Sequence, residues 1–165
     1  MSKLNNSDIS IVLYEPRIPQ NTGNIGRTCL AFNFKLVLIE PLGFNIDDKQ
    51  LKRAGLDYWK NIDLYRYPTF NKFKKSFQNS RIISFSKQGG ISLSSLKFRP
   101  NDCLLFGRED IGLPEVVKSD SDIISTIDMP CLINNENSRG VRSLNLSVSC
   151  GIAAYFAHCS LSNQN

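Results

Sequence analysis

The sequence contains a single histidine, His158, and lacks the short motifs that mark several common enzyme classes. It has no H-E-x-x-H zinc pair, no G-x-x-x-x-G-K-[S/T] phosphate loop and no G-x-G-x-x-G turn after an expected strand. A Ser-His-Asp or Cys-His catalytic arrangement would depend on His158 alone, which lies near the end of an expected helix. These absences argue against zinc proteases, P-loop enzymes, common dinucleotide enzymes and histidine-dependent hydrolases.

The five cysteines are odd in number and include no C-x-x-C pair. We therefore expect neither a disulfide framework nor a metal site, and reduced thiols that behave as small apolar side chains. No apolar run reaches the roughly 18–20 residues that a transmembrane helix needs. We expect one domain over residues 9–160, a disordered lead-in over 1–8, a tail over 161–165, and a cytoplasmic protein without a membrane partner.

Positive charge is concentrated in the N-terminal half of the chain. The net charge is +5, and residues 1–80 hold 12 Lys and Arg against 7 Asp and Glu. Residues 81–165 hold 8 of each sign. A basic half favours a polyanionic partner, because phosphate contacts release counterions. A solvated basic surface is the alternative explanation.

Short apolar runs alternate with helical patterns along the chain. The runs are nearly continuous in Ile, Val, Leu and Phe, as in strands covered on both faces, and lie at residues 9–14, 35–39, 81–85, 103–106 and 123–127, with a weaker edge candidate at 61–67. Helices are expected over 47–55, 69–76 and 144–158. In the last of these, Leu144, Val148, Ile152 and Tyr155 share one face. This alternation predicts an α/β fold with a parallel sheet flanked by helices.

Ligands of parallel sheets bind beyond the carboxyl ends of the strands. In this chain the segments at those ends span residues 15–23, 86–90, 107–113 and 128–142, and they are rich in Gly, Pro, Asn and charged residues. We therefore expect the functional site at this edge of the sheet.

Three polar segments near these strand ends contain the candidate functional residues. Residues 19–27 open a helix whose backbone N–H groups can receive an anion, with Arg27 about one helical turn inside. Gly107 ends a buried strand and permits close backbone approach to a flat ligand. Ser143 is expected to cap the last helix, and Asn145 to hydrogen-bond across to another loop. Taken singly, each segment is also explained by ordinary helix capping or a tight turn.

Together the three segments resemble the motifs of the SPOUT family of methyltransferases, in order and along nearly the whole chain. The chain is most similar to the small single-domain tRNA 2′-O-methyltransferases that act on the wobble nucleotide. The blocks that carry this resemblance are Val-Leu-Tyr-Glu-Pro at 12–16, the stretch 21–27, Ile-Glu-Pro-Leu-Gly-Phe at 39–44, Arg-Ala-Gly-Leu-Asp-Tyr at 53–58 and Phe-Gly-Arg-Glu at 106–109. The resemblance implies a homodimer with a deep C-terminal trefoil knot that methylates the wobble cytidine or uridine ribose from S-adenosyl-L-methionine, leaving S-adenosyl-L-homocysteine.

The resemblance also assigns roles to individual residues, with the tRNA anticodon stem-loop as partner and no metal. The implied cofactor-binding residues are Phe85, Gly107, Ile127 and Ser143, and the implied catalytic residues are Arg27, Asn21, Asn145 and Tyr155. The RNA-binding candidates are Arg17, Asn24, Lys49, Arg53 and Arg142. A guanidinium with a pKa above about 12 is a poor base, so we assign Arg27 to clamping a phosphate and positioning the 2′-hydroxyl. Packing inside a dimer is the alternative role for Tyr155.

Two features depart from the family pattern. Asp128 stands where relatives commonly carry proline, and residues 130–140 form a longer loop than in compact relatives. Both lie beside the expected cofactor site, so its methionine-tail contacts can be rearranged. The alternative functions are 2′-O-methylation of another tRNA position or of ribosomal RNA and, in another class, a catalytically silent RNA-binding dimer. The intact Asn21, Arg27, Gly107 and Asn145 argue against the silent dimer.

Overall fold

The computed structural model describes residues 9–46, 56–87, 89–129 and 140–162. In these ranges seven strands form one sheet in the order β3-β2-β1-β6-β4-β7-β5, and all neighbouring strands are parallel. The strands are β1 (Ser10–Tyr14), β2 (Lys35–Ile39), β3 (Leu64–Tyr67), β4 (Ile82–Phe85), β5 (Ile91–Ser92), β6 (Cys103–Phe106) and β7 (Ile123–Thr126). The predicted α/β fold is confirmed.

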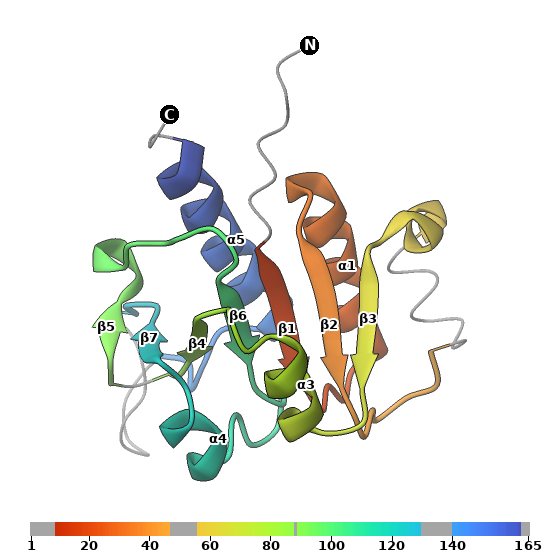
Figure 1. Cartoon of the computed structure of the whole chain (residues 1–165), viewed down its shortest axis with the longest axis horizontal. Coiled ribbons are helices and arrows are strands. Elements are labelled where there is room, and N and C mark those ends of the chain that lie inside the picture. Colours follow the sequence, from red (N-terminus) through yellow and green to blue (C-terminus); the bar gives the residue numbers. More distant parts are fainter. Residues whose placement is uncertain (1–8, 47–55, 88, 130–139, 163–165) are drawn as a thin grey trace.

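Helices cover both faces of the sheet (Figure 1). They are α1 (Pro19–Phe32), α3 (Phe70–Ser76), α4 (Glu115–Ser119) and α5 (Leu146–Ser162), with the short 3-10 helices η1 (Leu56–Asn61) and η2 (Leu93–Ser95). α1 and α5 pack side by side on one face, whereas α3 and α4 lie on the other. None of the helices in the described ranges is long and apolar enough to cross a membrane.

Each face of the sheet has its own apolar core, because successive side chains of a strand point to opposite faces. Ile11 and Leu13 of β1 pack with α1 and α5, and both side chains are fully buried. Val12 points to the opposite face, where it belongs to one cluster with Phe73 of α3 and Val117 of α4. Burying a side chain of this size contributes about 1.5–3 kcal/mol, so these two cores hold the strand ends in fixed positions.

The strands agree with the apolar runs to within a few residues, and the weaker candidate is confirmed as the edge strand β3. The helix expected over 69–76 is also confirmed, with Thr69 as its N-cap accepting a hydrogen bond from the Lys72 N–H at 3.2 Å. The two-residue strand β5 and the five-residue helix α4 were not predicted, because elements this short contain no full period of a pattern. The helix expected over 47–55 lies outside the described residues.

The last helix runs over Leu146–Ser162 rather than the predicted 144–158. Its buried face consists of small side chains, Cys150, Ala153, Ala154 and Ala157, which permit close packing against α1 and the sheet. On the face expected to be apolar, the Val148 and Tyr155 side chains are 49% and 59% exposed in the single chain. α5 is therefore apolar on its outer side as well as on its buried side.

Candidate active site

A cleft of about 740 Å³ opens at the carboxyl edge of the sheet, beside the ends of β4, β6 and β7. It lies where the strand ends were expected to form the functional site. All four predicted cofactor-binding residues line it: Phe85, Gly107, Ile127 and Ser143. Asn21, Asn145 and Arg142 line it as well, so segments from three distant parts of the sequence meet at one cavity.

The cleft combines a flat apolar wall with a tight glycine turn. The rings of Phe85 and Phe106 stack at 4.5 Å between centroids with an interplanar angle of 8°. After Phe106 the chain folds back on itself, because the Arg108 and Gly112 backbones exchange hydrogen bonds of 3.2 and 2.9 Å. A Cβ on Gly107 would lie 2.3 Å from the Leu113 nitrogen, so only glycine fits this turn.

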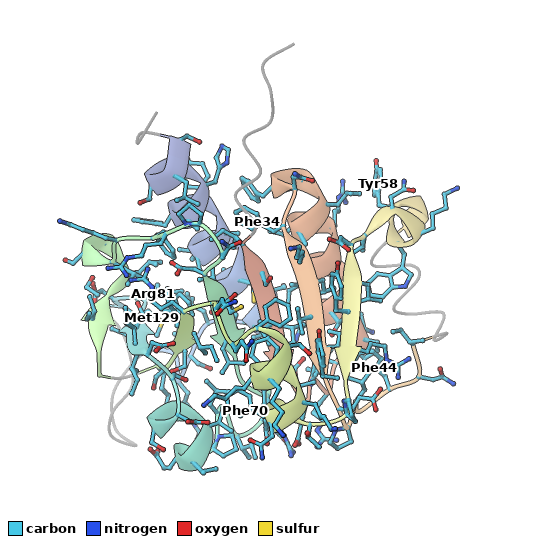
Figure 2. The ribbon with its side chains drawn as sticks, viewed as in Figure 1. Phe34, Phe44, Tyr58, Phe70, Arg81 and Met129 are labelled. Carbon is cyan, nitrogen blue, oxygen red and sulfur yellow. The ribbon has the colours of Figure 1, made fainter. Side chains whose placement is uncertain are left out.

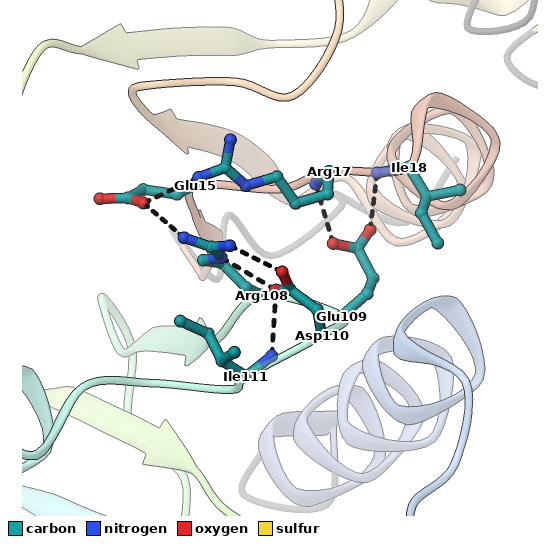
Figure 3. A network of polar contacts seen from close by, with 7 residues as sticks. All are labelled: Glu15, Arg17, Ile18, Arg108, Glu109, Asp110 and Ile111. Carbon is teal, nitrogen blue, oxygen red and sulfur yellow. Dashed lines mark hydrogen bonds and ion pairs between the residues drawn. The ribbon is translucent and has the colours of Figure 1, made fainter.

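Glu109 joins this turn to the start of α1 (Figure 3). Its carboxylate accepts hydrogen bonds from the backbone N–H groups of Arg17 at 2.8 Å and Ile18 at 3.1 Å. It also accepts one from the Asn21 side-chain amide at 3.2 Å. The Glu109 carboxylate therefore binds the two N–H groups just before Pro19, where α1 begins, and anion binding by the N–H groups of residues 19–27 stays a prediction. No role was predicted for Glu109, because its partners lie 88–92 residues away in sequence.

A second set of charges surrounds the same turn (Figure 3). One carboxylate oxygen of Glu15, which has a left-handed φ of 47°, contacts the guanidinium groups of Arg17 at 3.3 Å and Arg108 at 3.4 Å. Arg108 also binds Asp110 through two hydrogen bonds of 2.9 and 2.7 Å and lowers the pKa of Asp110 to about 2. Arg17, an RNA-binding candidate, is thus held by an acidic neighbour with its side chain 31% exposed.

Asn145 connects the last helix to α1. Its side-chain amide donates to the Asn21 carbonyl oxygen at 3.0 Å, across 124 residues of sequence, as predicted for a contact with another loop. The Asn145 side-chain oxygen accepts from the Ser147 N–H at 2.8 Å, so Asn145 caps α5. The prediction that Ser143 caps this helix is wrong, because the helix begins only at Leu146. Glu109, Asn21, Asn145 and Ser147 form one continuous chain of hydrogen bonds.

Two residues with predicted catalytic roles, Arg27 and Tyr155, do not line the cleft of their own chain. α1 begins at Pro19, so Arg27 lies eight residues inside, about 12 Å along the helix axis. The expectation of one helical turn was wrong, because Pro19 already occupies the first helical position. Arg27 and Asn24 are exposed on α1, and the pKa of Tyr155 is raised by a side-chain hydrogen bond with Cys159.

The remaining basic candidates have different surroundings. Arg142 is exposed and lines the cleft. Lys49 and Arg53 lie outside the described residues. On α3, Lys72 is exposed, whereas Lys74 forms a 2.6 Å ion pair with Asp120. Because α3 covers the face of the sheet opposite α1 and α5, these lysines lie on that face as well.

Asp128 does not line the cleft, although both of its sequence neighbours, Ile127 and Met129, do. Its carboxylate accepts a short hydrogen bond from the Ser92 hydroxyl at the end of β5. The residue that departs from the family pattern is therefore directed toward the sheet edge. Residues 130–139 of the long loop lie outside the described residues.

The charges that line the cleft are mixed, with Lys87, Arg108, Lys118 and Arg142 against Glu109 and Asp110. The described lining residues include serine hydroxyls, and none of them is a histidine or a cysteine. Among the residues that the structure describes, no group of three or more His, Cys, Asp or Glu side chains is placed to hold a metal ion. This arrangement is suited to binding and orienting a ligand that carries its own reactive group.

A parallel sheet with a cleft at its carboxyl edge is typical of α/β proteins that bind a ligand there, and comparison with known proteins identifies the family. The model of the SpoU rRNA Methylase family matches residues 8–155, so the chain belongs to this family. The resemblance seen in the motifs is confirmed.

Three of the relatives, each more than 35% identical, match this chain over nine-tenths or more of their own length. The tRNA (cytidine(34)-2′-O)-methyltransferase of Escherichia coli K12 is 36% identical over 149 residues, covering 90% of this chain and 91% of that protein. The protein of the same name from Aeromonas hydrophila is 38% identical, covering 89% and 90%. A solved structure described as giving insights into 2-OH methylation of C/U34 on tRNA has a TM-score of 0.86 and 44% identity, and the match covers 94% of this chain and 97% of that one. The SpoU methyltransferase AviRb of Streptomyces viridochromogenes, solved with AdoMet, shares the fold at a TM-score of 0.83 and 17% identity, over 95% of this chain and 62% of its own.

Proposed function

We propose that this protein transfers a methyl group from S-adenosyl-L-methionine to the ribose 2′-hydroxyl of the wobble nucleotide, cytidine or uridine, in the tRNA anticodon stem-loop. The observation that carries the proposal is the meeting of Asn21, Gly107 and Asn145 at one cleft in a chain that matches relatives named for this reaction over nine-tenths of its length. A tRNA substrate implies that the protein works in the cytoplasm.

The cleft fits S-adenosyl-L-methionine in size and chemistry. Its volume lies inside the roughly 300–1,000 Å³ range of small-molecule sites. The Phe85 ring, stacked on the buried Phe106, offers an apolar surface for adenine, and the lack of a side chain at Gly107 permits close approach of its polar edge to the backbone. We assign Ile127 and Ser143 to the opposite wall. When bound, the cofactor supplies an activated methyl group on a sulfonium, so neither a metal nor a protein nucleophile is required.

The work left to the protein is to align the ribose oxygen with that methyl group and to help remove its proton. Asn21 and Asn145 are tied to each other and to the loop of Glu109, which fixes the part of the site nearest the cofactor. Arg27 clamps an RNA phosphate and positions the 2′-hydroxyl. The hydroxyl proton leaves through Arg27 or through the adjacent phosphate as the oxygen gains the methyl group. Positioning of this kind can contribute several kcal/mol to the rate.

We further propose that the active unit is a homodimer with a deep C-terminal knot. Arg27 lies about 9 Å along α1 from Asn21 and does not line its own cleft, which supports its use at the cleft of a second copy. The exposed apolar residues of α5, including Val148, Tyr155 and Phe156, favour burial between two chains. In this arrangement Tyr155 contacts the partner chain or RNA.

The test of the substrate is to digest tRNA from a strain that lacks this protein and to search for the missing 2′-O-methyl nucleoside by mass spectrometry. Loss of methylation at the wobble ribose is the expected result. Unchanged wobble methylation with a loss at another tRNA position or in ribosomal RNA would refute the proposed substrate and identify the other one. The family description names rRNA, so ribosomal RNA is included in the same digest.

The test of the mechanism is Arg27→Ala, which should retain cofactor binding by calorimetry and lose methyl transfer. Arg66→Ala is the matched control. Arg66 lies on the edge strand β3, forms a 2.5 Å ion pair with Glu40 and does not line the cleft. Near wild-type turnover by Arg27→Ala would show that the assigned role is wrong. Absence of any cofactor binding by the wild-type chain would instead favour a silent RNA-binding dimer.

A further inference from the structure

The short helix η1 docks on α1 through a glycine. Gly26 of α1 faces η1, where a Cβ would lie 2.9 Å from Cζ3 of Trp59 and 2.6 Å from Cδ1 of Ile62. Both distances are shorter than ordinary Cβ contacts, so a side chain at position 26 would force the Trp59 ring and the Ile62 side chain to move. The absence of a side chain therefore lets η1 approach α1 closely and fixes which residues of the two helices face each other.

This docking places an aromatic ring of η1 against Arg27, the residue that follows Gly26. The Arg27 Cζ atom lies 5.7 Å from the centroid of the Tyr58 ring, within the range of a cation–π contact. The Tyr58 side chain is 44% exposed and projects from the outer side of η1 (Figure 2). Arg27 and Tyr58 therefore form an exposed pair on the α1 side of the sheet.

The partner of Arg27 differs in kind from the partners of four other arginines in the described ranges. Arg17, Arg66, Arg81 and Arg108 each contact a carboxylate. A carboxylate neutralises the guanidinium and occupies its donors, whereas a ring contacts only one face of it. The edge donors of Arg27 are thereby left available for a phosphate or a ribose oxygen, and its charge is kept.

We propose that Tyr58 is a positioning residue for Arg27, an inference that rests on the proposed function. The Tyr58 ring restricts the orientations of the long arginine side chain before RNA binds, so less conformational entropy is lost when the guanidinium contacts phosphate and ribose. Gly26 and Trp59 keep the ring in place by holding η1 against α1. The substrate group that this pair recognises is the ribose-phosphate backbone beside the methylated nucleotide.

The test compares Tyr58→Ala, Tyr58→Phe and the control Tyr65→Ala. Tyr65 lies on the edge strand β3 and is similarly exposed at 39%. We expect Tyr58→Ala to lower kcat for tRNA about tenfold, because RNA desolvates the pair and strengthens its contribution. The KM for S-adenosyl-L-methionine should not change, since Tyr58 does not line the cleft. Tyr58→Phe should restore the rate because the ring alone makes the contact, and Tyr65→Ala should match wild type.

Two further measurements separate positioning from folding and from the proposed function itself. In an Arg27→Ala background, Tyr58→Ala should not lower the residual rate measured with excess enzyme under single-turnover conditions, because the two residues act as a unit. In arginine-selective NMR, the Arg27 Nε–H signal should carry a ring-current shift that Tyr58→Phe keeps and Tyr58→Ala removes. Three results would each overturn the assignment. They are wild-type activity of Tyr58→Ala, an equal loss of rate from Tyr58→Ala in the wild-type and Arg27→Ala backgrounds, and an Arg27 Nε–H signal that Tyr58→Ala leaves unchanged. Absence of methyl transfer by the wild-type chain would refute the proposed function, and with it this role of Tyr58.

Discussion

Glu109 is the residue whose removal should disturb the site most directly. Its one carboxylate accepts hydrogen bonds from two backbone N–H groups just before α1 and from one side chain of α1. Its hydrogen bonds to the Arg17 N–H, the Ile18 N–H and the Asn21 amide measure 2.8, 3.1 and 3.2 Å. A hydrogen bond to a charged group contributes about 1.5–3 kcal/mol when buried. Glu109 is only half-buried, so water replaces part of what is lost. We therefore expect Glu109→Ala to lower the free energy of unfolding by about 2–3 kcal/mol.

The effect on activity should exceed the effect on stability. Without Glu109, Asn21 loses one of its two anchors, and its contact with Asn145 is no longer held in register with the Gly107 turn. Misplacement of a positioning group by about 1 Å can cost on the order of a hundredfold in rate. Glu109→Gln keeps one acceptor but turns an amide N–H toward a donor, so an intermediate loss is expected.

The assay combines urea unfolding with methyl transfer under single-turnover conditions. Glu115→Gln is the matched control, because that side chain on α4 is 90% exposed and bonds only to Lys118 among the described residues. It should change the free energy of unfolding by less than about 0.5 kcal/mol. An unfolding midpoint and a methylation rate for Glu109→Ala equal to those of wild type would refute the reasoning.

Three further predictions concern other parts of the molecule. Asp102 is 1% exposed and binds Arg81 through two hydrogen bonds, so Asp102→Ala should cost about 3–5 kcal/mol in urea unfolding, and a loss below 1 kcal/mol would contradict this. Gly107→Ala should weaken cofactor binding more than about tenfold by calorimetry, because the added Cβ would overlap the Leu113 backbone; unchanged affinity would show that the turn can adjust. Burial raises the pKa of Cys103 to about 12, so its thiol stays protonated through pH 8–10. Peptide mapping after alkylation of the folded chain should therefore find Cys159 labelled and Cys103 unlabelled, and early labelling of Cys103 would contradict its burial.

Local patterns in the sequence were sufficient to predict the strands and the edge of the sheet where the site lies. Runs such as Cys103–Phe106 are continuous in apolar residues because both faces of a parallel strand are covered. Gly107 could be singled out because a strand that ends in glycine signals a close approach of backbone. The meeting of Asn145 with a distant loop was also predictable, since a short amide side chain at a helix start has donors left over.

The partners of these residues could not be predicted from the sequence in the same way. The carboxylate of Glu109 accepts hydrogen bonds from the N–H groups of Arg17 and Ile18 just before α1, whereas the local pattern over residues 19–27 indicates only that an anion fits near that helix start. Asn145 was mistaken for a bridging residue only, whereas it also caps α5 in place of Ser143. Both outcomes depend on the residues at which α1 and α5 begin. The start of α5 at Leu146 instead of the predicted residue 144 is enough to change which side chain caps the helix.

The sequence by itself determined the α/β class, the order of the strands along the chain and the motif residues, because hydrophobic periodicity and turn chemistry act between near neighbours. Only the tertiary structure decided that Glu109 anchors Asn21, that Tyr58 rather than a carboxylate faces Arg27, and that Arg27 does not line its own cleft. The two contacts join residues that are 88 and 31 positions apart in the sequence. Their geometry follows from how the helices pack on the sheet, and no local preference of the chain encodes that packing.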